Sequence, residues 1–257
     1  MTLPSLMVAP NGARRSKADH PALPVTLPEI VETARACHAA GAGGLHLHLR
    51  DAEGRHLLDA GLYAEALAEL GRAVPEMAVQ ITTEAVGMYA PEHQRQVALE
   101  SGAALVSISI REITRDTEPA DSARFFSRCA AAGISVQHIL YDPGDIDLLC
   151  RTLPDDLLHV PDLQVIHVLG RYAADQDSRP DDLAPFLGVM ASRGLSTDWA
   201  ACAFGRGETA CLVHAHAMGG KCRVGFENSL WRADGSLARD NAQRVRDIVK
   251  VTRAAPG

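Results

Sequence analysis

The sequence repeats one local pattern eight times: a short apolar or alternating stretch is followed by a loop and then by a longer stretch with helical periodicity. Strands that alternate with helices are typical of parallel sheets, because each helix returns the chain to the same edge of the sheet. Eight such units without interruption favour a closed barrel over an open sheet. The strands we predict are Leu6–Asn11, Gly44–Arg50, Ala78–Thr83, Leu105–Arg111, Ser135–Tyr141, Leu163–Leu169, Ser196–Ala201 and Cys222–Glu227.

Helical patterns fill the connections between these strands, and several open with proline or with an acidic first turn, as helices do. They begin near Pro28, Gly61, Pro91, Asp121, Asp145, Pro180, Glu208 and Asn241. The linkers are short, and the length of 257 residues matches the roughly 250 residues that a (β/α)8 barrel needs. We therefore predict an α/β fold with a single domain over residues 1–257, a (β/α)8 (TIM) barrel.

Composition and charge exclude several classes of function. The 25 lysines and arginines are outnumbered by 32 acidic residues, so the net charge of −7 offers no basic surface for nucleic acid. No apolar run approaches the ~20 residues of a membrane span, and the first ten residues lack a signal-peptide pattern. The six cysteines form no Cys-x-x-Cys pair, which indicates reduced thiols. We expect a cytoplasmic protein that acts on small molecules.

In a barrel of this kind, the carboxyl ends of the strands form the functional face. The second predicted strand ends in Leu45-His46-Leu47-His48-Leu49-Arg50, where polar residues alternate with leucines. The two-residue period of a strand then turns His46, His48 and Arg50 into the barrel and the leucines toward the helices. Two imidazoles on one strand face can share a divalent metal, and neutral imidazole is a common ligand of zinc. Two buried histidines bonded to backbone carbonyls are the simpler alternative.

A catalytic zinc site needs a third protein ligand and a vacant position. Glu227 is our candidate, because strands eight, one and two are neighbours in a closed barrel and Glu227 shares its parity with Arg223 on strand eight. A carboxylate that only pairs with Arg223 is the alternative. The sequence thus predicts one Zn²⁺ per chain, bound by His46, His48 and Glu227.

Further polar residues mark the ends of the other strands. Ser107-Ile108-Ser109-Ile110-Arg111 alternates, and we expect it to turn two hydroxyls and a guanidinium to one face, where they can bind a substrate carboxylate. Polar residues that only form a layer of the barrel core are the alternative. Glu84 follows the third strand, where an acid is either a general base or a helix cap. We expect substrate contacts from Asn11, Arg50, Thr82, Thr83, Ser107, Ser109 and Asn228.

Several stretches of the chain match a known family. They are Asn11-Gly12-Ala13, Pro24-Val25-Thr26, His46-Leu47-His48-Leu49-Arg50-Asp51, Gly54-Arg55, Arg223-Val224-Gly225-Phe226-Glu227 and Asn241-Ala242-Gln243. Through them the chain resembles, nearly end to end, the β-keto acid cleavage enzymes, the family that includes the 3-keto-5-aminohexanoate cleavage enzyme of lysine fermentation.

The resemblance implies a (β/α)8 barrel that binds Zn²⁺ through His46, His48 and Glu227 in a homo-oligomer, a dimer or a tetramer. It implies an enzyme of amino acid catabolism that converts a β-keto acid and acetyl-CoA into acetoacetate and a new CoA thioester, by condensation and retro-Claisen cleavage. The metal would chelate the keto and carboxylate oxygens and stabilise enolate charge. Arg223 matches the family's buried arginine, which would hold an anionic intermediate or the acid that positions a base.

The chain departs from the family pattern at the residues for proton transfer. Family members follow the ligand glutamate with aspartate, whereas this chain has Asn228, whose amide cannot accept a proton at neutral pH. Where family members have a pair of glycines after the third strand, this chain has Glu84-Ala85. Where they have an acidic segment on the fifth strand, it has Val136-Gln137-His138-Ile139. We therefore expect either that proton transfer has moved to a catalytic Glu84 or His138, or that the barrel performs different chemistry.

Two other functions stay open on the sequence. A metal-dependent hydrolase of the amidohydrolase type would add His138 and His167 to His46, His48 and Glu227 and would bind two metals. A binding module would keep the metal pocket but, without a base because of Asn228, would release no product. Metal content distinguishes the two enzymes, since one zinc per chain supports the cleavage enzyme and two support the hydrolase.

Overall fold

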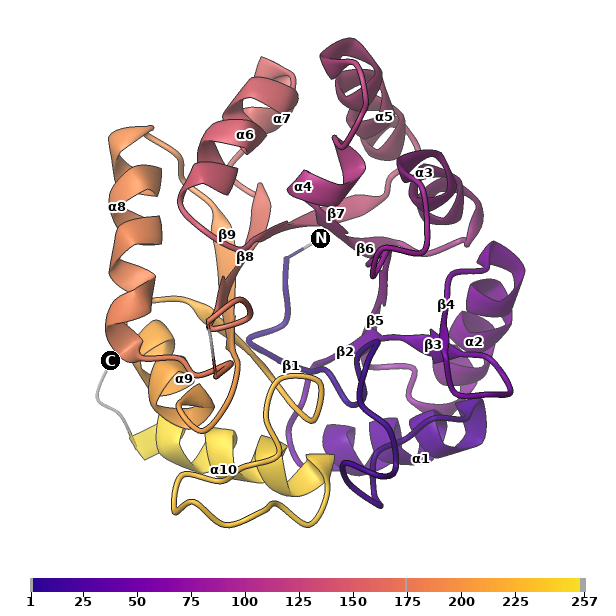
Figure 1. The fold of residues 1–257 in the computed structure, drawn as a ribbon, viewed down its shortest axis with the longest axis vertical. Helices are drawn as coiled ribbons and strands as arrows, with labels where there is room; N and C mark the ends of the chain where they lie inside the picture. Colours follow the sequence, from indigo (N-terminus) through magenta and orange to yellow (C-terminus); the bar gives the residue numbers. More distant parts are fainter. Residues whose placement is uncertain (1, 174, 255–257) are drawn as a thin grey trace.

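The computed structural model describes residues 2–173 and 175–254, and it confirms the predicted barrel. Eight strands close into one barrel in the order β1-β10-β9-β8-β7-β6-β5-β2, so the last strand lies beside the first (Figure 1). All neighbouring strands in this order are parallel. They are β1 (Leu6–Val8), β2 (Gly44–Leu47), β5 (Ala78–Thr82), β6 (Leu105–Ser109), β7 (Ser135–Leu140), β8 (Gln164–Leu169), β9 (Asp198–Ala203) and β10 (Lys221–Val224).

Helices form an outer ring around the barrel (Figure 1). The longer ones are α1 (Leu27–Ala39), α2 (Ala60–Ala73), α3 (Pro91–Glu100), α5 (Pro119–Ala131), α6 (Gly144–Thr152), α8 (Ala184–Ser192), α9 (Glu208–Ala217) and α10 (Asn241–Ala254). Three short helices lie between them: α4 (Ile110–Ile113), α7 (Asp155–Leu158) and the 3-10 helix η1 (Pro180–Leu183). Within the described part of the chain, no helix is both long enough and apolar enough to cross a membrane.

Alternation along the strands separates two apolar layers. Met7, Leu105 and Ile166 belong to a buried cluster whose side chains fill the barrel interior. Leu45 and Leu47 instead belong to the large buried cluster between the barrel and the helices. The predicted direction of these two leucines is therefore confirmed, and it places the intervening histidine inside the barrel.

β6 is shorter than predicted, because a helix begins inside the predicted strand. Ser109 ends β6, and its hydroxyl accepts a hydrogen bond from the backbone N–H of Glu112 at 3.4 Å, which caps the start of α4. Arg111 therefore lies on α4 and pairs with Asp142 and Asp145. The expectation that this arginine shares a face with the two serines is wrong.

The second predicted strand is divided in two. β2 ends at Leu47, and β3 (Leu49–Arg50) pairs instead with β4 (His56–Leu57) in a small antiparallel sheet, with Arg50 opposite His56. Arg50 donates hydrogen bonds to the carbonyl oxygens of Gly12, Arg15 (3.1 Å) and Gly54 (2.9 Å). The prediction that Arg50 points into the barrel is wrong, and the side chain instead ties the β1–α1 loop to the hairpin.

Candidate metal centre and active site

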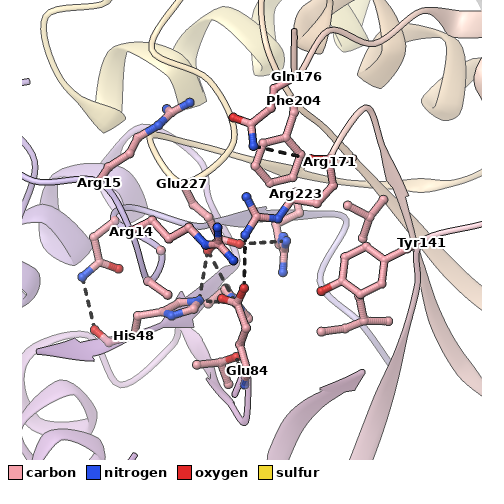
Figure 2. Close-up of a pocket in the computed structure, with 17 residues that line it drawn as sticks. Arg14, Arg15, His48, Glu84, Tyr141, Arg171, Gln176, Phe204, Arg223 and Glu227 are labelled. Carbon is pink, nitrogen blue, oxygen red and sulfur yellow. Dashed lines mark hydrogen bonds and ion pairs between the residues drawn. The ribbon is translucent and has the colours of Figure 1, made fainter. Parts of the chain in front are cut away.

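A pocket opens at the carboxyl ends of the barrel strands, where the fold predicts function. Its lining comes from the residues at or just past the ends of β1, β2, β5, β7, β8, β9 and β10. Figure 2 shows the polar groups of this lining, among them His48, Glu84, Arg223 and Glu227, directed toward one another. The barrel thus gathers residues that are up to 216 positions apart, Asn11 and Glu227, in one cavity.

Three side chains in the pocket have the geometry of a metal centre. The Nε2 atoms of His46 and His48 are 3.1 Å apart, and the Oε2 atom of Glu227 is 3.6 Å from the first and 3.3 Å from the second. These three atoms all lie within 4.8 Å of one another. Two imidazole nitrogens and one carboxylate oxygen form the donor set of many catalytic zinc sites, so the residues fit the ion that the sequence predicts.

The imidazole of His46 is prepared to bind a cation. Burial, followed by the nearby charge of Arg223, lowers the pKa of His46 to about 3, so the ring is neutral near pH 7. Its Nδ1 lies 2.8 Å from Oε1 of Gln80, which therefore accepts the Nδ1–H and leaves the Nε2 lone pair facing the cluster. Gln80 was not predicted, although its place opposite His46 in the β2–β5 register marks it.

Arg223 keeps the carboxylate of Glu227 charged. The Arg223 NH2 group donates to Glu227 Oε1 at 3.1 Å, and the guanidinium is 4% exposed. Burial alone would raise the pKa of Glu227, but Arg223 and the two histidines hold this pKa well below its usual value. The alternative of a carboxylate that only pairs with arginine is not what the structure shows, because the other carboxylate oxygen faces His46 and His48.

Two glycines allow this close packing. Gly12 has φ +62°, and a side chain there would meet Cγ of Glu227 at 2.6 Å. Gly225 has φ +143°, and a side chain there would collide with the carbonyl oxygen of Ala9. Gly225 thus lets the backbone turn between Arg223 and Glu227, and Gly12 leaves room for the side chain of Glu227.

Glu84 and Arg171 form a second polar pair in the pocket. Glu84 follows β5, Arg171 follows β8, and Arg171 NH2 lies 3.3 Å from Glu84 Oε1 (Figure 2). Arg171 also lies over the ring of Phe204, at 5.0 Å from its centroid. Tyr141, past the end of β7, lines the same cavity. Arg171 and Tyr141 were not assigned roles from sequence, although both lie just past strand ends.

The predicted substrate-binding residues divide into two groups. Asn11 and Thr82 line the pocket, and the Nδ2 group of Asn11 donates to the His48 carbonyl oxygen at 3.2 Å. The residues that do not line it are Arg50, Thr83, Ser107, Ser109 and Asn228. Thr83 donates to a backbone carbonyl of β6, and Asn228 is fully buried. The side chains of Arg50, Thr83, Ser107 and Ser109 form hydrogen bonds with the backbone instead, whereas the amide of Asn228 has no partner among the described residues.

His138 and His167 lie on the other side of the barrel wall. His138 packs against Phe126 of α5, with ring centroids 5.0 Å apart, and His167 packs against Phe186 of α8 at 4.9 Å. Neither lines the pocket, so the placement of His138 in the catalytic site is wrong. The five-ligand site of the hydrolase alternative is not formed, and that alternative is not favoured.

Comparisons with known proteins find relatives over nearly the whole chain. A family model described as beta-keto acid cleavage enzyme matches residues 5–256. The 3-keto-5-aminohexanoate cleavage enzyme of Fusobacterium nucleatum is 27% identical over 251 residues, which cover 94% of this chain and 88% of the relative. The 3-oxoadipate:acetyl-CoA acetyltransferase of Cupriavidus necator is 23% identical over 258 residues, 96% of this chain and 88% of the relative.

A solved structure shares the fold. The binary complex of ObcA with oxaloacetate superposes with a TM-score of 0.67 at 18% identity, and the match covers 91% of this chain but only 65% of that chain. At this identity the likeness supports the barrel alone. The family model, by contrast, spans nearly the whole sequence and includes His46, His48 and Glu227. The chain therefore belongs to the beta-keto acid cleavage enzyme family.

Proposed function

We propose that the protein is a zinc-dependent β-keto acid cleavage enzyme. It converts a β-keto acid and acetyl-CoA into acetoacetate and a new CoA thioester, by condensation followed by retro-Claisen cleavage. The observation that carries the proposal is the convergence of His46, His48 and Glu227 on one point of the pocket. Relatives named for cleavage of a keto acid and for transfer with acetyl-CoA support the reaction type.

His46, His48 and Glu227 hold the cation, with the carboxylate kept ionised by Arg223. Zn²⁺ bound there supplies positive charge that stabilises negative charge on the keto and carboxylate oxygens of the substrate. Arg223 has two further donors, Nε and NH1, which are buried and have no hydrogen-bond partner among the described residues. They are available to an anionic intermediate, because a buried donor without a partner is unfavourable until an acceptor arrives.

Glu84 is the general base of this proposal. Apart from the ligand Glu227, it is the carboxylate among the residues that line the pocket. Its pairing with Arg171 fixes the direction of the carboxylate, which removes a proton from the substrate carbon between the two carbonyl groups. Glu84 thereby takes over the proton transfer that the amide of Asn228 cannot perform.

The charge of the pocket suits anionic substrates. Four arginines line it, Arg14, Arg15, Arg171 and Arg223, against two glutamates, Glu84 and Glu227, so the lining carries a net charge of +2 before any metal binds. The whole chain, in contrast, has a net charge of −7. A positive cleft on an acidic protein attracts small anions such as a β-keto carboxylate and the phosphates of acetyl-CoA.

A screen of the zinc-loaded protein tests the proposal. β-Keto acids are incubated with acetyl-CoA, acetoacetate is measured, and the metal content per chain is determined by emission spectrometry. We expect about one zinc per chain and acetoacetate that forms only when both substrates are present. Two metals per chain with hydrolysis in the absence of acetyl-CoA would instead identify a hydrolase. Substrate binding without any product would identify the binding module, which keeps the metal pocket but lacks a base.

We further propose that the enzyme works in the cytoplasm as a homo-oligomer, a dimer or a tetramer, as the family resemblance implies. Light scattering of the purified protein tests the assembly, and a mass of one 27.4 kDa chain would contradict it. Nucleic acid is not expected to bind, because the chain is acidic overall.

A further inference from the structure

A third buried histidine lies beside the candidate metal centre. His56, on β4, is 4% exposed, and its ring centroid is 5.3 Å from that of His48. It belongs to neither the ligand set nor the pocket lining. The hairpin β3–β4 holds it in place through the pairing of Arg50 with His56. This arrangement calls for a physical explanation, because a buried imidazole needs partners for both of its nitrogens.

One nitrogen of His56 has an unambiguous role. Its Nε2 lies 2.7 Å from the backbone carbonyl oxygen of Glu84. A carbonyl oxygen only accepts hydrogen bonds, so Nε2 carries the proton and Nδ1 of the neutral ring carries a lone pair. That Nδ1 is buried and has no hydrogen-bond partner among residues 2–173 and 175–254.

His48 has an unpaired hydrogen-bond donor that could match this acceptor. Its Nε2 faces Glu227 and His46, so when this nitrogen binds the cation the proton of the neutral ring resides on Nδ1. The Nδ1 of His48 is also buried and also lacks a partner in the described chain. A buried donor on one ring and a buried acceptor on the adjacent ring would each be costly if left unpaired.

The other ligand histidine shows how the second ring nitrogen of a ligand finds an acceptor. His46 donates its Nδ1–H to Gln80 at 2.8 Å, which aims its Nε2 at the cluster. Ligand histidines in metal sites generally donate their second N–H to an acceptor, and the acceptor fixes both tautomer and ring orientation. Among the described residues no carboxylate or amide takes this position beside His48, and the neighbouring ring is that of His56.

We propose that His56 is a positioning residue of the metal centre, whose Nδ1 accepts the Nδ1–H of His48 through one buried water, because neither Nδ1 atom has a direct partner among the described residues. The Glu84 carbonyl sets the tautomer of His56, His56 sets the tautomer of His48, and His48 thereby directs Nε2 at the cation. This inference rests on the proposed metal centre. It also gives the β3–β4 hairpin a function, which is to bring His56 against the second ligand.

Zinc affinity measured on the metal-free protein tests the inference. The protein is titrated with Zn²⁺ in competition with a chromogenic chelator, and the folded state of each variant is verified by circular dichroism. His56→Phe keeps a ring but removes the acceptor, and we expect zinc binding about 10- to 100-fold weaker. His56→Gln retains an acceptor oxygen and is expected to recover part of the loss. Unchanged zinc affinity in folded His56→Phe would overturn the inference.

His93→Phe is the matched control. His93 donates to the Leu58 carbonyl oxygen at 2.8 Å and stacks on Tyr89, but it does not contact the ligands. We expect its zinc affinity to remain within about twofold of the parent, since the donor set is untouched. A loss in His93→Phe equal to that in His56→Phe would show a general packing effect and would overturn the specific role of His56.

A measurement on the unaltered protein does not depend on the folding of a variant. Long-range proton–nitrogen NMR of the zinc-loaded protein should show His48 protonated at Nδ1 and His56 protonated at Nε2. Protonation of His56 at Nδ1 would overturn the inference while leaving the metal centre intact. If the parent binds no zinc and His46→Ala changes nothing, both the metal centre and the inference fail.

Discussion

Glu84 lies two residues past the end of β5, and Arg171, two residues past the end of β8, pairs with it across the pocket. We expect Glu84→Gln to lower turnover by about 10²- to 10⁴-fold, because the amide cannot accept the substrate proton. Zinc affinity should not change, since Glu84 is not one of the converging ligands. Steady-state kinetics with a β-keto acid and acetyl-CoA measure the effect.

His138→Leu is the control for this variant. The ring lies between β7 and α5, outside the pocket, so turnover should stay within about twofold of the parent. Full activity in Glu84→Gln would remove the carboxylate from the mechanism. A large loss in folded His138→Leu would contradict the placement of that histidine behind the barrel wall.

At the level of single residues, the sequence predicted the side chains whose direction follows from alternation alone. The leucines on both sides of His46 fix its face, and Glu227 follows from the closure of the barrel. His138 was misplaced because its nearness to a strand end was used without its parity. Ile139 and Tyr141 line the pocket, so His138, which directly precedes Ile139, must point outward. Gln80 required the register of β2 against β5.

The hairpin β3–β4 is the element that sequence alone could not supply. Alternation continues without a break from His46 to Arg50, but the hydrogen bonds pass from the barrel to a separate sheet after Leu47. A period of two reports which face a side chain takes within one strand, and it does not report which strand is the partner. α4 was missed for a similar reason, because the helix cap at Ser109 also fits an alternating strand.

The hydrogen bonds of Arg50 give a prediction at the scale of the structural element. Its guanidinium donates to carbonyl oxygens at Gly12, Arg15 and Gly54, which joins the hairpin to the loop that forms one wall of the pocket. We expect Arg50→Met to raise the KM for the β-keto acid at least severalfold and to lower stability by about 1–3 kcal/mol, because several acceptors lose a charged donor. Denaturant unfolding and steady-state kinetics measure the two effects.

Arg115→Met is a suitable control for the loss of an arginine. Arg115 donates one hydrogen bond, to the Tyr89 carbonyl oxygen at 3.3 Å, from an exposed position outside the pocket. Its loss should change stability by less than about 0.5 kcal/mol and should leave the KM unchanged. An Arg50→Met protein with the parent's KM would show that the loop keeps its shape without the hydrogen bonds of Arg50.

At the scale of the whole molecule, buried histidines make the fold sensitive to acid. Burial lowers the pKa of His56 and His138 to about 3 and that of His167 to about 4, and burial with the charge of Arg223 lowers that of His46 to about 3. Below the ordinary histidine pKa of about 6.5, the unfolded chain therefore binds protons that the folded chain refuses. Glu208 acts in the opposite sense, because burial raises its pKa to about 7 despite its pairing with Arg244.

The directions of these pKa shifts determine how stability changes with pH. Between about pH 6.5 and 4.5 the number of histidine protons on the unfolded chain rises to roughly four, against roughly one on Glu208 in the folded chain, so acidification favours unfolding. The free energy of unfolding of the metal-free protein should fall by up to about 4 kcal/mol per pH unit in this window and should level off above pH 7. Urea unfolding at a series of pH values measures the slope.

The double variant His138→Leu/His167→Leu should have a smaller slope. Leucine removes both groups from the titration, so the unfolded chain should bind roughly two fewer protons. A parent slope near zero, or a double variant with the parent's slope, would show that the folded chain accommodates charged histidines in its apolar layer.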